Sequence, residues 1–230
     1  MGKQTGAVQI EGRVGGVIFY KTRKGKALVR QAPAPSVGIA YKTNPNTEQS
    51  RCNNTEFGRA ATSTAWLRRG VEAVFDTRGD EVHFRLTAAL LRCMKDDPVN
   101  PLGQRQLTAT GMAPIAGFEW NEVHAAAPLL GAAAEVTGSI LTVTAQRPLL
   151  PEGCYSATVR LAILGFDAAR LLAKKPAAVV SVDSAVVVKG SGQSLVLSIA
   201  LPATGLWIAV LGYPDMRAEE MPVMVVAAGG

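Results

Sequence analysis

Short runs of β-branched and aromatic residues, separated by glycine, open the chain and predict a β-hairpin arm. Three of these runs have the length of strands: residues 8–10, 14–21 and 27–31. The polar residues 23–26 separate the last two runs, and Gly25 gives the backbone the freedom that a tight turn requires. The proline-rich segment 32–36 follows and predicts an extended, semi-rigid connector.

The hydrophobic spacing then changes to every third or fourth residue, which is typical of amphipathic helices. This pattern predicts one long helix over 47–76 and a second helix over 81–95. Asn46, three residues before Gln49, resembles the capping box that starts a helix. The second helix begins with acidic residues and ends with basic ones, which matches the helix dipole.

From residue 104 onward the pattern predicts a β-rich part. Runs rich in Val, Ile, Leu and Thr alternate with clusters of Gly, Pro, Asp and Ser, and the runs are 105–110, 115–120, 133–144, 155–164, 178–188, 194–201, 206–213 and 222–228. Their spacing is typical of an antiparallel sandwich or barrel. Residues 167–175 predict a short helical turn between two of these strands.

The segment 190–214 carries no charged residue, so it has to be tested as a membrane span. A spanning helix needs about 20 consecutive apolar residues. Here the turn-forming residues 202–205 divide the apolar run into two pieces of strand length. We therefore predict a buried β-hairpin of 195–201 and 206–213, and no membrane contact.

Composition favours self-association. Hydrophobic residues make up 48% of the 230 and charged residues only 18%, whereas about 25% is typical of soluble domains. A body with so little charge has few means to keep its copies apart. The first residues lack the apolar stretch of a secretory signal, which predicts synthesis in the cytoplasm without a signal peptide. Three widely spaced cysteines, an odd number, predict reduced thiols and no disulfide framework.

The whole net charge of the chain lies in its first 30 residues. They hold seven Lys and Arg against the single acidic residue Glu11, and the resulting +6 equals the net charge of the whole chain. Such a basic arm either meets an acidic partner, docks on a neighbouring subunit or keeps a strand edge soluble. The candidate contact residues are Arg13, Phe19, Tyr20, Lys21, Arg23, Lys24, Lys26 and Arg30.

The sequence shows no pattern for catalysis, metal or cofactor binding. The glycine cluster 12–16 matches neither the dinucleotide-binding fingerprint nor the P-loop, and a strand follows it, so its glycines predict a tight turn or bulge. His83 and His124 have no second ligand at a metal-binding spacing. We therefore predict a non-enzymatic protein without cofactor.

Three segments together resemble an uncharacterised protein family of Bacteroidota and their phages and mobile elements. Gly12–Tyr20 resembles the family's G-x-x-G-x-x-V-x-F-Y hairpin, and Thr47–Arg51 is close to its T-x-x-Q-x-x-R helix start, with altered spacing. Gly117–Asn121 looks like its G-F-x-F-N segment. The resemblance covers about the first two thirds of the chain. It implies the order hairpin, helices and β-sandwich, and it implies no catalytic residue.

These observations predict an α+β protein with an N-terminal β-hairpin arm and connector (1–36), a two-helix segment (37–100) and an immunoglobulin-like antiparallel sandwich (101–230). The predicted function is that of a structural subunit that assembles with itself and with other proteins of a phage-like particle, tail or filament. In this prediction the arm is an intersubunit clasp and the final location is the virion or assembled particle. The alternatives are a nucleic-acid-binding protein that uses the arm, and a surface or carbohydrate-binding sandwich module.

Overall fold

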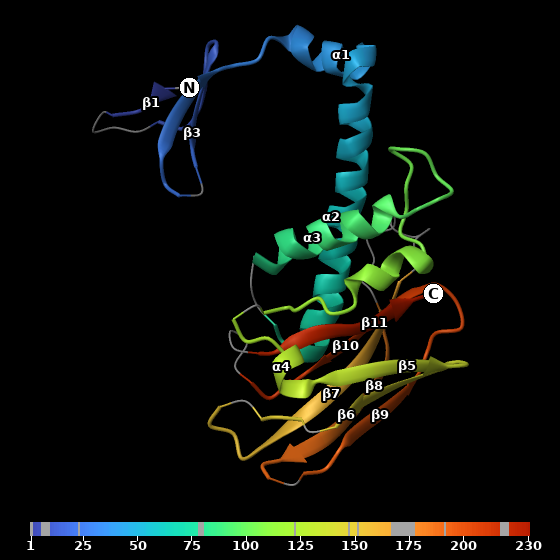
Figure 1. The fold of residues 1–230 in the computed structure, drawn as a ribbon. Helices are drawn as coiled ribbons and strands as arrows, with labels where there is room; N and C mark the ends of the chain where they lie inside the picture. The colour runs from blue at the N-terminus through green and yellow to red at the C-terminus, as the bar shows by residue number, and fades with distance from the viewer. Residues whose placement is uncertain are drawn as a thin grey trace. The chain divides into compact units, whose positions relative to one another are not determined.

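The computed structural model describes residues 2–5, 10–22, 24–77, 81–121, 123–146, 148–150, 152–166, 178–190, 192–216 and 221–230 (Figure 1). Its helices and antiparallel sheets confirm the predicted mixed α and β class. The chain forms two compact units, Met1–Arg51 and Cys52–Gly230. The predicted three-part division of the chain stays a prediction.

The first unit contains a small antiparallel sheet. Its strands are β1 (Gly2–Lys3), β2 (Gly12–Val14), β3 (Val17–Lys21) and β4 (Ala27–Gln31), in the order β1-β4-β3-β2. The single strand predicted over 14–21 is wrong, because a turn at Gly15 and Gly16 divides it into β2 and β3. Of the strand predicted over 8–10, Ile10 lies outside any strand, and residues 8 and 9 are outside the described residues.

Two helical elements precede the long helix. They are α1 (Pro35–Thr43), which the sequence analysis did not predict, and the 3₁₀ turn η1 (Pro45–Thr47). The extended connector therefore ends at residue 34 rather than 36, because proline is well tolerated in the first turn of a helix. The cap at this corner comes from the Asn44 side chain, which accepts a hydrogen bond from the Asn46 N–H (2.9 Å), and not from Asn46.

Arg51 stabilises the junction between α1 and the long helix α2 (Glu48–Phe75). Its guanidinium donates to the backbone carbonyls of Tyr41 (2.8 Å) and Asn44 (3.0 Å) and to the Thr47 hydroxyl (2.7 Å). Thr47 donates in turn to the same two carbonyls. The Thr and Arg of the T-x-x-Q-x-x-R segment thus satisfy backbone groups that the end of α1 leaves open.

The two predicted long helices are confirmed as α2 (Glu48–Phe75) and α3 (Glu81–Lys95). The strands predicted over 105–110 and 115–120 are wrong. The 3₁₀ helix η2 (Thr110–Ile115) lies there instead, with the isolated bridge of Glu119 to Met224 after it. Apolar residues of this region pack individually against the helices: Met112 and Ile115 are both fully buried there.

After the short helix α4 (Ala127–Leu130) the described chain forms two antiparallel sheets. Their strands are β5 (Ala132–Thr137), β6 (Ile140–Ala145), β7 (Ser156–Phe166), β8 (Ala178–Val188), β9 (Leu195–Ala200), β10 (Leu206–Gly212) and β11 (Val223–Gly229). The strand orders are β11-β10-β7-β8 and β5-β6-β9. The strand predicted over 133–144 is wrong as one element, because a turn at Gly138 and Ser139 makes it the hairpin β5–β6. The helical turn predicted over 167–175 lies outside the described residues.

The uncharged segment near the C-terminus does form two strands, but the predicted hairpin is wrong. β9 pairs with β6 in one sheet, whereas β10 pairs with β7 and β11 in the other. Among the described helices, none is both long and apolar enough to cross a membrane.

Two hydrophobic cores give the second unit three layers, with α2, α3 and η2 over one sheet and the second sheet on its other face (Figure 1). One core joins the helices to β7, β10 and β11, through residues such as Phe75, Leu90 and Ile208. The other core joins the two sheets, through residues such as Leu141, Leu161 and Leu197. The strands β7, β10 and β11 of the sheet β11-β10-β7-β8 are therefore covered on both faces.

The Gly117–Asn121 segment extends this sheet along β11. Backbone hydrogen bonds join Gly117 and Phe118 to Val225, and Trp120 to Val223. Arg85 of α3 holds the segment from the other side, because its guanidinium donates to the carbonyls of Glu119 (3.0 Å) and Trp120 (2.7 Å). The same guanidinium lies over the Phe118 ring, 5.3 Å from its centre.

Replacing Arg85 should therefore detach this segment and destabilise the second unit, Cys52–Gly230, which we call the body. We expect Arg85→Ala to lower the free energy of unfolding by about 2 kcal/mol, the usual range for hydrogen bonds to a charged group. The control is Arg92→Ala, an exposed arginine on the same helix, which should change it by less than about 0.5 kcal/mol. Chemical denaturation measures both values, and equal effects of the two changes would contradict this role.

Asp97, just after α3, organises the loop that follows. Its buried carboxylate accepts hydrogen bonds from the Asn100 side chain and from the backbone N–H groups of Val99, Asn100 and Gln106. The Asn100 amide first, and then these N–H groups, hold the pKa of Asp97 well below its usual range.

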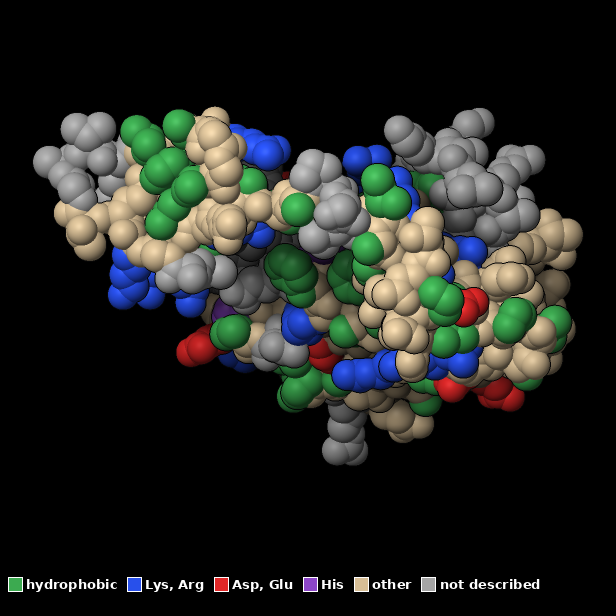
Figure 2. Space-filling view, turned by 90° about the horizontal axis from the view of Figure 1, so that it is seen from above, with side chains coloured by type: hydrophobic (Ala, Val, Ile, Leu, Met, Phe, Trp, Pro, Cys, Tyr) green, Lys and Arg blue, Asp and Glu red, His purple; other side chains and the backbone are tan. Residues whose placement is uncertain are grey.

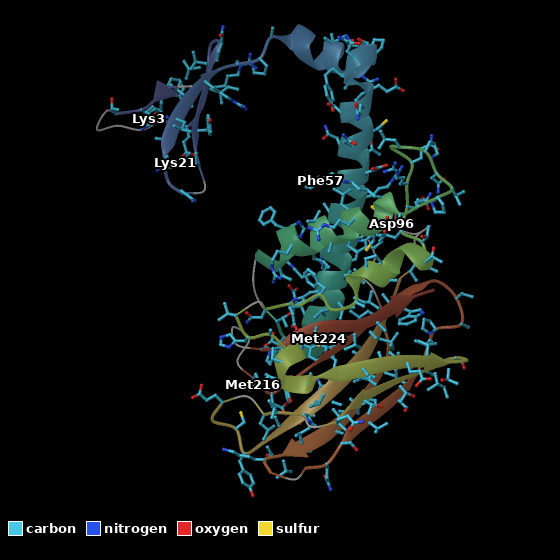
Figure 3. The ribbon with its side chains drawn as sticks, in the orientation of Figure 1. Lys3, Lys21, Phe57, Asp96, Met216 and Met224 are labelled. Carbon is cyan, nitrogen blue, oxygen red and sulfur yellow. The ribbon has the colours of Figure 1, made fainter. Side chains whose placement is uncertain are left out.

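Because the carboxyl of an unfolded chain has a pKa of about 3.9, Asp97 stabilises the fold above that pH and stops doing so as the pH falls toward its lower native pKa. We expect Asp97→Asn to lower the melting temperature at pH 7, and this deficit to shrink below about pH 4. Thermal melts across this range measure the effect. The control is Asp96→Asn at the exposed neighbour (Figure 3), and a deficit that is the same at every pH would contradict the argument.

Candidate interaction surface on the N-terminal arm

The register of the arm sheet sorts its side chains onto two faces. Phe19 lies opposite Val29, whereas Tyr20 lies opposite Leu28 and Ile18 opposite Arg30. Paired residues share a face, and successive residues of a strand point to opposite faces. The apolar face therefore consists of Val14, Val17, Phe19, Lys21, Ala27, Val29 and Gln31, and the basic face consists of Lys3, Arg13, Ile18, Tyr20, Leu28 and Arg30.

The apolar face has charge only at its end, where Lys21 lies. Its side chains are incompletely covered: Val14 is 64% exposed, and Val17, Phe19 and Val29 are half-buried. Among the described residues up to Arg51, Ala27 is the one buried side chain. Figure 2 shows a group of hydrophobic side chains on the surface of the arm, at the left of the view. Within its described residues, this unit has no second layer over the face.

The basic face holds its polar groups in two rows across the strands. Arg13, Ile18 and Arg30 form one row over β2, β3 and β4. Tyr20, Leu28 and Lys3 form the next row over β3, β4 and β1. The Arg30 guanidinium lies over the Tyr20 ring, 5.5 Å from its centre. This face thus combines cations, a tyrosine ring and small apolar patches.

The eight residues predicted from the sequence do not form one patch. Arg13, Tyr20 and Arg30 share the basic face, whereas Phe19 and Lys21 belong to the apolar face. Lys24 and Lys26 are exposed in the turn between β3 and β4, and Arg23 is outside the described residues. The sequence analysis missed Lys3, which lies on β1, across the sheet from Lys21 at the end of β3 (Figure 3). Nothing in the hydrophobic pattern indicates that residues 2 and 3 pair with β4.

The rest of the described chain offers little for catalysis. No group of three or more His, Cys, Asp or Glu in the described residues could hold a metal ion. The three cysteines are free thiols, and burial raises the pKa of Cys93 to about 11, which makes it a poor nucleophile at neutral pH. Burial likewise raises the pKa of Tyr213 to about 12, and its hydroxyl donates to the Leu149 carbonyl (2.7 Å).

An open hollow of about 490 Å³ lies at one end of the two sheets. Glu152, Cys154 and Lys189 line it among mostly apolar residues. The Cys154 sulfhydryl contacts the sulfur of Met216 (3.8 Å) rather than a base that could activate it. Among the described residues that line the hollow, Cys154 is therefore not paired with a base.

No protein-family model matches this chain, and neither a curated protein nor a solved structure matches it.

The turn between β2 and β3 tests how far the arm sheet depends on backbone conformation. Gly15 has a φ of 57°, whereas Gly16 is not in the left-handed region, and an added Cβ would meet no atom within 4 Å at either position. We expect Gly15→Ala to weaken the arm sheet by about 1 kcal/mol and Gly16→Ala to have a much smaller effect. Hydrogen exchange of the amides of β2 and β3 measures the difference, and equal protection in both variants would contradict it.

Proposed function

We propose that this protein is a non-enzymatic structural subunit that self-assembles into a phage-like particle, tail or filament, with its N-terminal arm as the clasp between subunits. The observation that carries the proposal is the uncovered apolar face of the arm sheet. Val14 is 64% exposed on it, and Phe19 is only half-buried. The phage-like setting rests on the resemblance of three segments to the family of Bacteroidota and their mobile elements.

A sheet of this size needs a second layer to be stable. Its strands have two to five residues, and a small sheet gains stability mainly by packing an apolar face against another element. Full burial of a Val or Phe side chain stabilises by about 1.5–3 kcal/mol. Covering Val14, Val17, Phe19 and Val29 would therefore offset much of the entropy lost in ordering the arm.

We infer that the second layer is the outer side of β8 in a neighbouring copy. Val182, Val186 and Val188 alternate along this strand and are 48%, 64% and 39% exposed. Ser184 lies between them, so the stripe carries no charge, like the centre of the arm's apolar face. Of the two faces of the arm sheet, only the apolar one can cover such a stripe without burying unpaired cations.

An arm that binds a different surface of the next copy makes a head-to-tail contact. Such contacts close into rings or continue as helical filaments, depending on the rotation between neighbours. This is the geometry that a tail or filament requires. The proline-containing residues 32–34 lie outside any helix or strand and connect the arm sheet to α1. Such a segment would let the arm extend toward a neighbouring copy.

We further infer that the described strands of the body form an immunoglobulin-like sandwich. In chain order, β5, β6, β7, β8, β9, β10 and β11 would be strands A, B, C, C′, E, F and G. The pairs β6–β9 and β7–β10 then correspond to B–E and C–F, the central pairs of that fold. A fold of this kind does not imply a function, so the proposed assembly depends on the arm.

Assembly is tested by the mass of the full chain over a range of concentrations, measured by sedimentation velocity. We expect oligomers, and we expect deletion of residues 1–31 to yield a monomer that is still folded. Phe19→Lys should also abolish assembly, whereas Tyr20→Lys, its neighbour on the other face, should not. A full chain that stays monomeric at every concentration would disprove the proposal.

A second pair of substitutions tests whether the outer side of β8 is the surface that receives the arm. Val186→Lys on β8 should block assembly, whereas Val196→Lys, at a similarly exposed valine on β9 (56% against 64%), should leave it intact. In mixtures of two variants, Val14→Cys should form a disulfide with Val186→Cys far more readily than Arg13→Cys does. The parent chain with its three native cysteines gives the background, and equal cross-linking by Val14→Cys and Arg13→Cys would reject β8 as the receiving surface.

A further inference from the structure

The basic face of the arm presents cations that no described carboxylate neutralises. In the described part of the chain, no carboxylate forms an ion pair with Lys3, Arg13 or Arg30. Glu11, exposed just before β2, is the one acidic residue among the first 30. The other 200 residues have equal numbers of acidic and basic side chains. The positive potential of the chain is therefore concentrated on the arm.

The spacing of these cations suits a chain of phosphates. Neighbouring strands lie about 4.8 Å apart, so Arg13 and Arg30, two strands apart in one row, have backbones about 10 Å apart. Lys3 lies in the adjacent row on the same face. Long Arg and Lys side chains reach several ångströms from the sheet, which lets three cations contact separate phosphates of one flexible strand.

The face also offers a surface for an unpaired base. Arg30 stacks over the Tyr20 ring, and Ile18 and Leu28 lie beside this pair. Unpaired bases stack on tyrosine rings and on the planes of arginine guanidiniums, whereas the bases of a duplex are inaccessible to them. An acidic protein or a lipid headgroup would use the cations but would gain nothing from the stacked pair.

We propose that the basic face of the arm binds single-stranded nucleic acid. Lys3, Arg13 and Arg30 contact its phosphates, and one base stacks on the pair of Arg30 and Tyr20. The site lies on the face opposite to the clasp, so it remains open when the apolar face is covered. The proposal stands on the charge and register of the arm and does not require assembly.

The experiment measures binding of a fluorescently labelled oligothymidine to the full chain by anisotropy, between about 50 and about 200 mM salt. Three phosphate contacts to a single strand predict that the logarithm of the binding constant falls with the logarithm of salt at a slope of about −2. Arg13→Gln and Arg30→Gln should each reduce this slope by about 0.7 and weaken binding several-fold. Lys21→Gln, which removes one charge from the other face, should change neither value.

Tyr20→Leu separates stacking from charge. It should weaken binding about fivefold or more while it leaves the slope unchanged, because it removes the ring and no cation. A duplex of the same sequence should bind more weakly than the single strand. A duplex that binds equally well, or phosphatidylserine vesicles that displace the oligonucleotide at equal charge concentration, would overturn the assignment to single-stranded nucleic acid.

The mass of each sample, measured in the same buffer, distinguishes the two proposals. Oligomers that bind no oligonucleotide at low salt would overturn the nucleic-acid site and leave the clasp intact. Monomers that bind with the expected slope would overturn the clasp and support the site. If Lys21→Gln lowered the slope as much as Arg13→Gln, binding would depend on the total charge of the arm. The assignment of the site to the basic face would then be wrong.

Discussion

The body of this protein depends on β10, the strand between β7 and β11, whose residues belong to both of its cores. All seven residues of Leu206–Gly212 are buried. Ile208 and Val210 point into the core with the helices, whereas Trp207 and Leu211 point into the core between the sheets. A strand covered on both faces is continuously apolar, which is why this segment resembles half of a membrane span in sequence. Every other layer of the body packs directly or indirectly against it.

Several polar contacts fix the layers around β10 in one arrangement. Arg160 of β7 donates to the Val74 carbonyl at the end of α2 (2.7 Å), and Glu56 of α2 accepts from the Gly103 N–H (2.7 Å). Both contacts satisfy backbone groups beside a helix, where an unpaired group would cost about 1–3 kcal/mol. The arm has nothing comparable among its described residues, since its hydrogen bonds are within its own sheet and turns. The body therefore has polar contacts between its elements, whereas the apolar face of the arm sheet is incompletely covered by the described residues of its own unit.

The sequence pattern predicted the two long helices well, the strands only in part and the strand partners poorly. The periodicity of α2 and α3 gave their ends to within one residue, because each helix carries one apolar stripe. β9 and β10 were recognisable as strands, but alternation does not say that β9 pairs with β6 and β10 with β7. In the arm, charge indicated the candidate segment. It could not separate Phe19 from Tyr20, because the faces follow from the Gly15 turn and from pairing with β4.

The two proposals for the arm are linked by electrostatics. The residues after the first 30 are neutral overall, so the bodies of neighbouring copies can approach closely, but each arm adds the whole +6 charge of the chain. Within an assembly the basic faces of neighbouring arms would repel one another over a Debye length of about 8 Å at physiological salt. A bound polyanion would remove this repulsion, and by linkage the assembled state would bind the polyanion more tightly than the free subunit does. The separation of apolar and basic side chains onto opposite faces of one small sheet would allow both proposed contacts to exist at once.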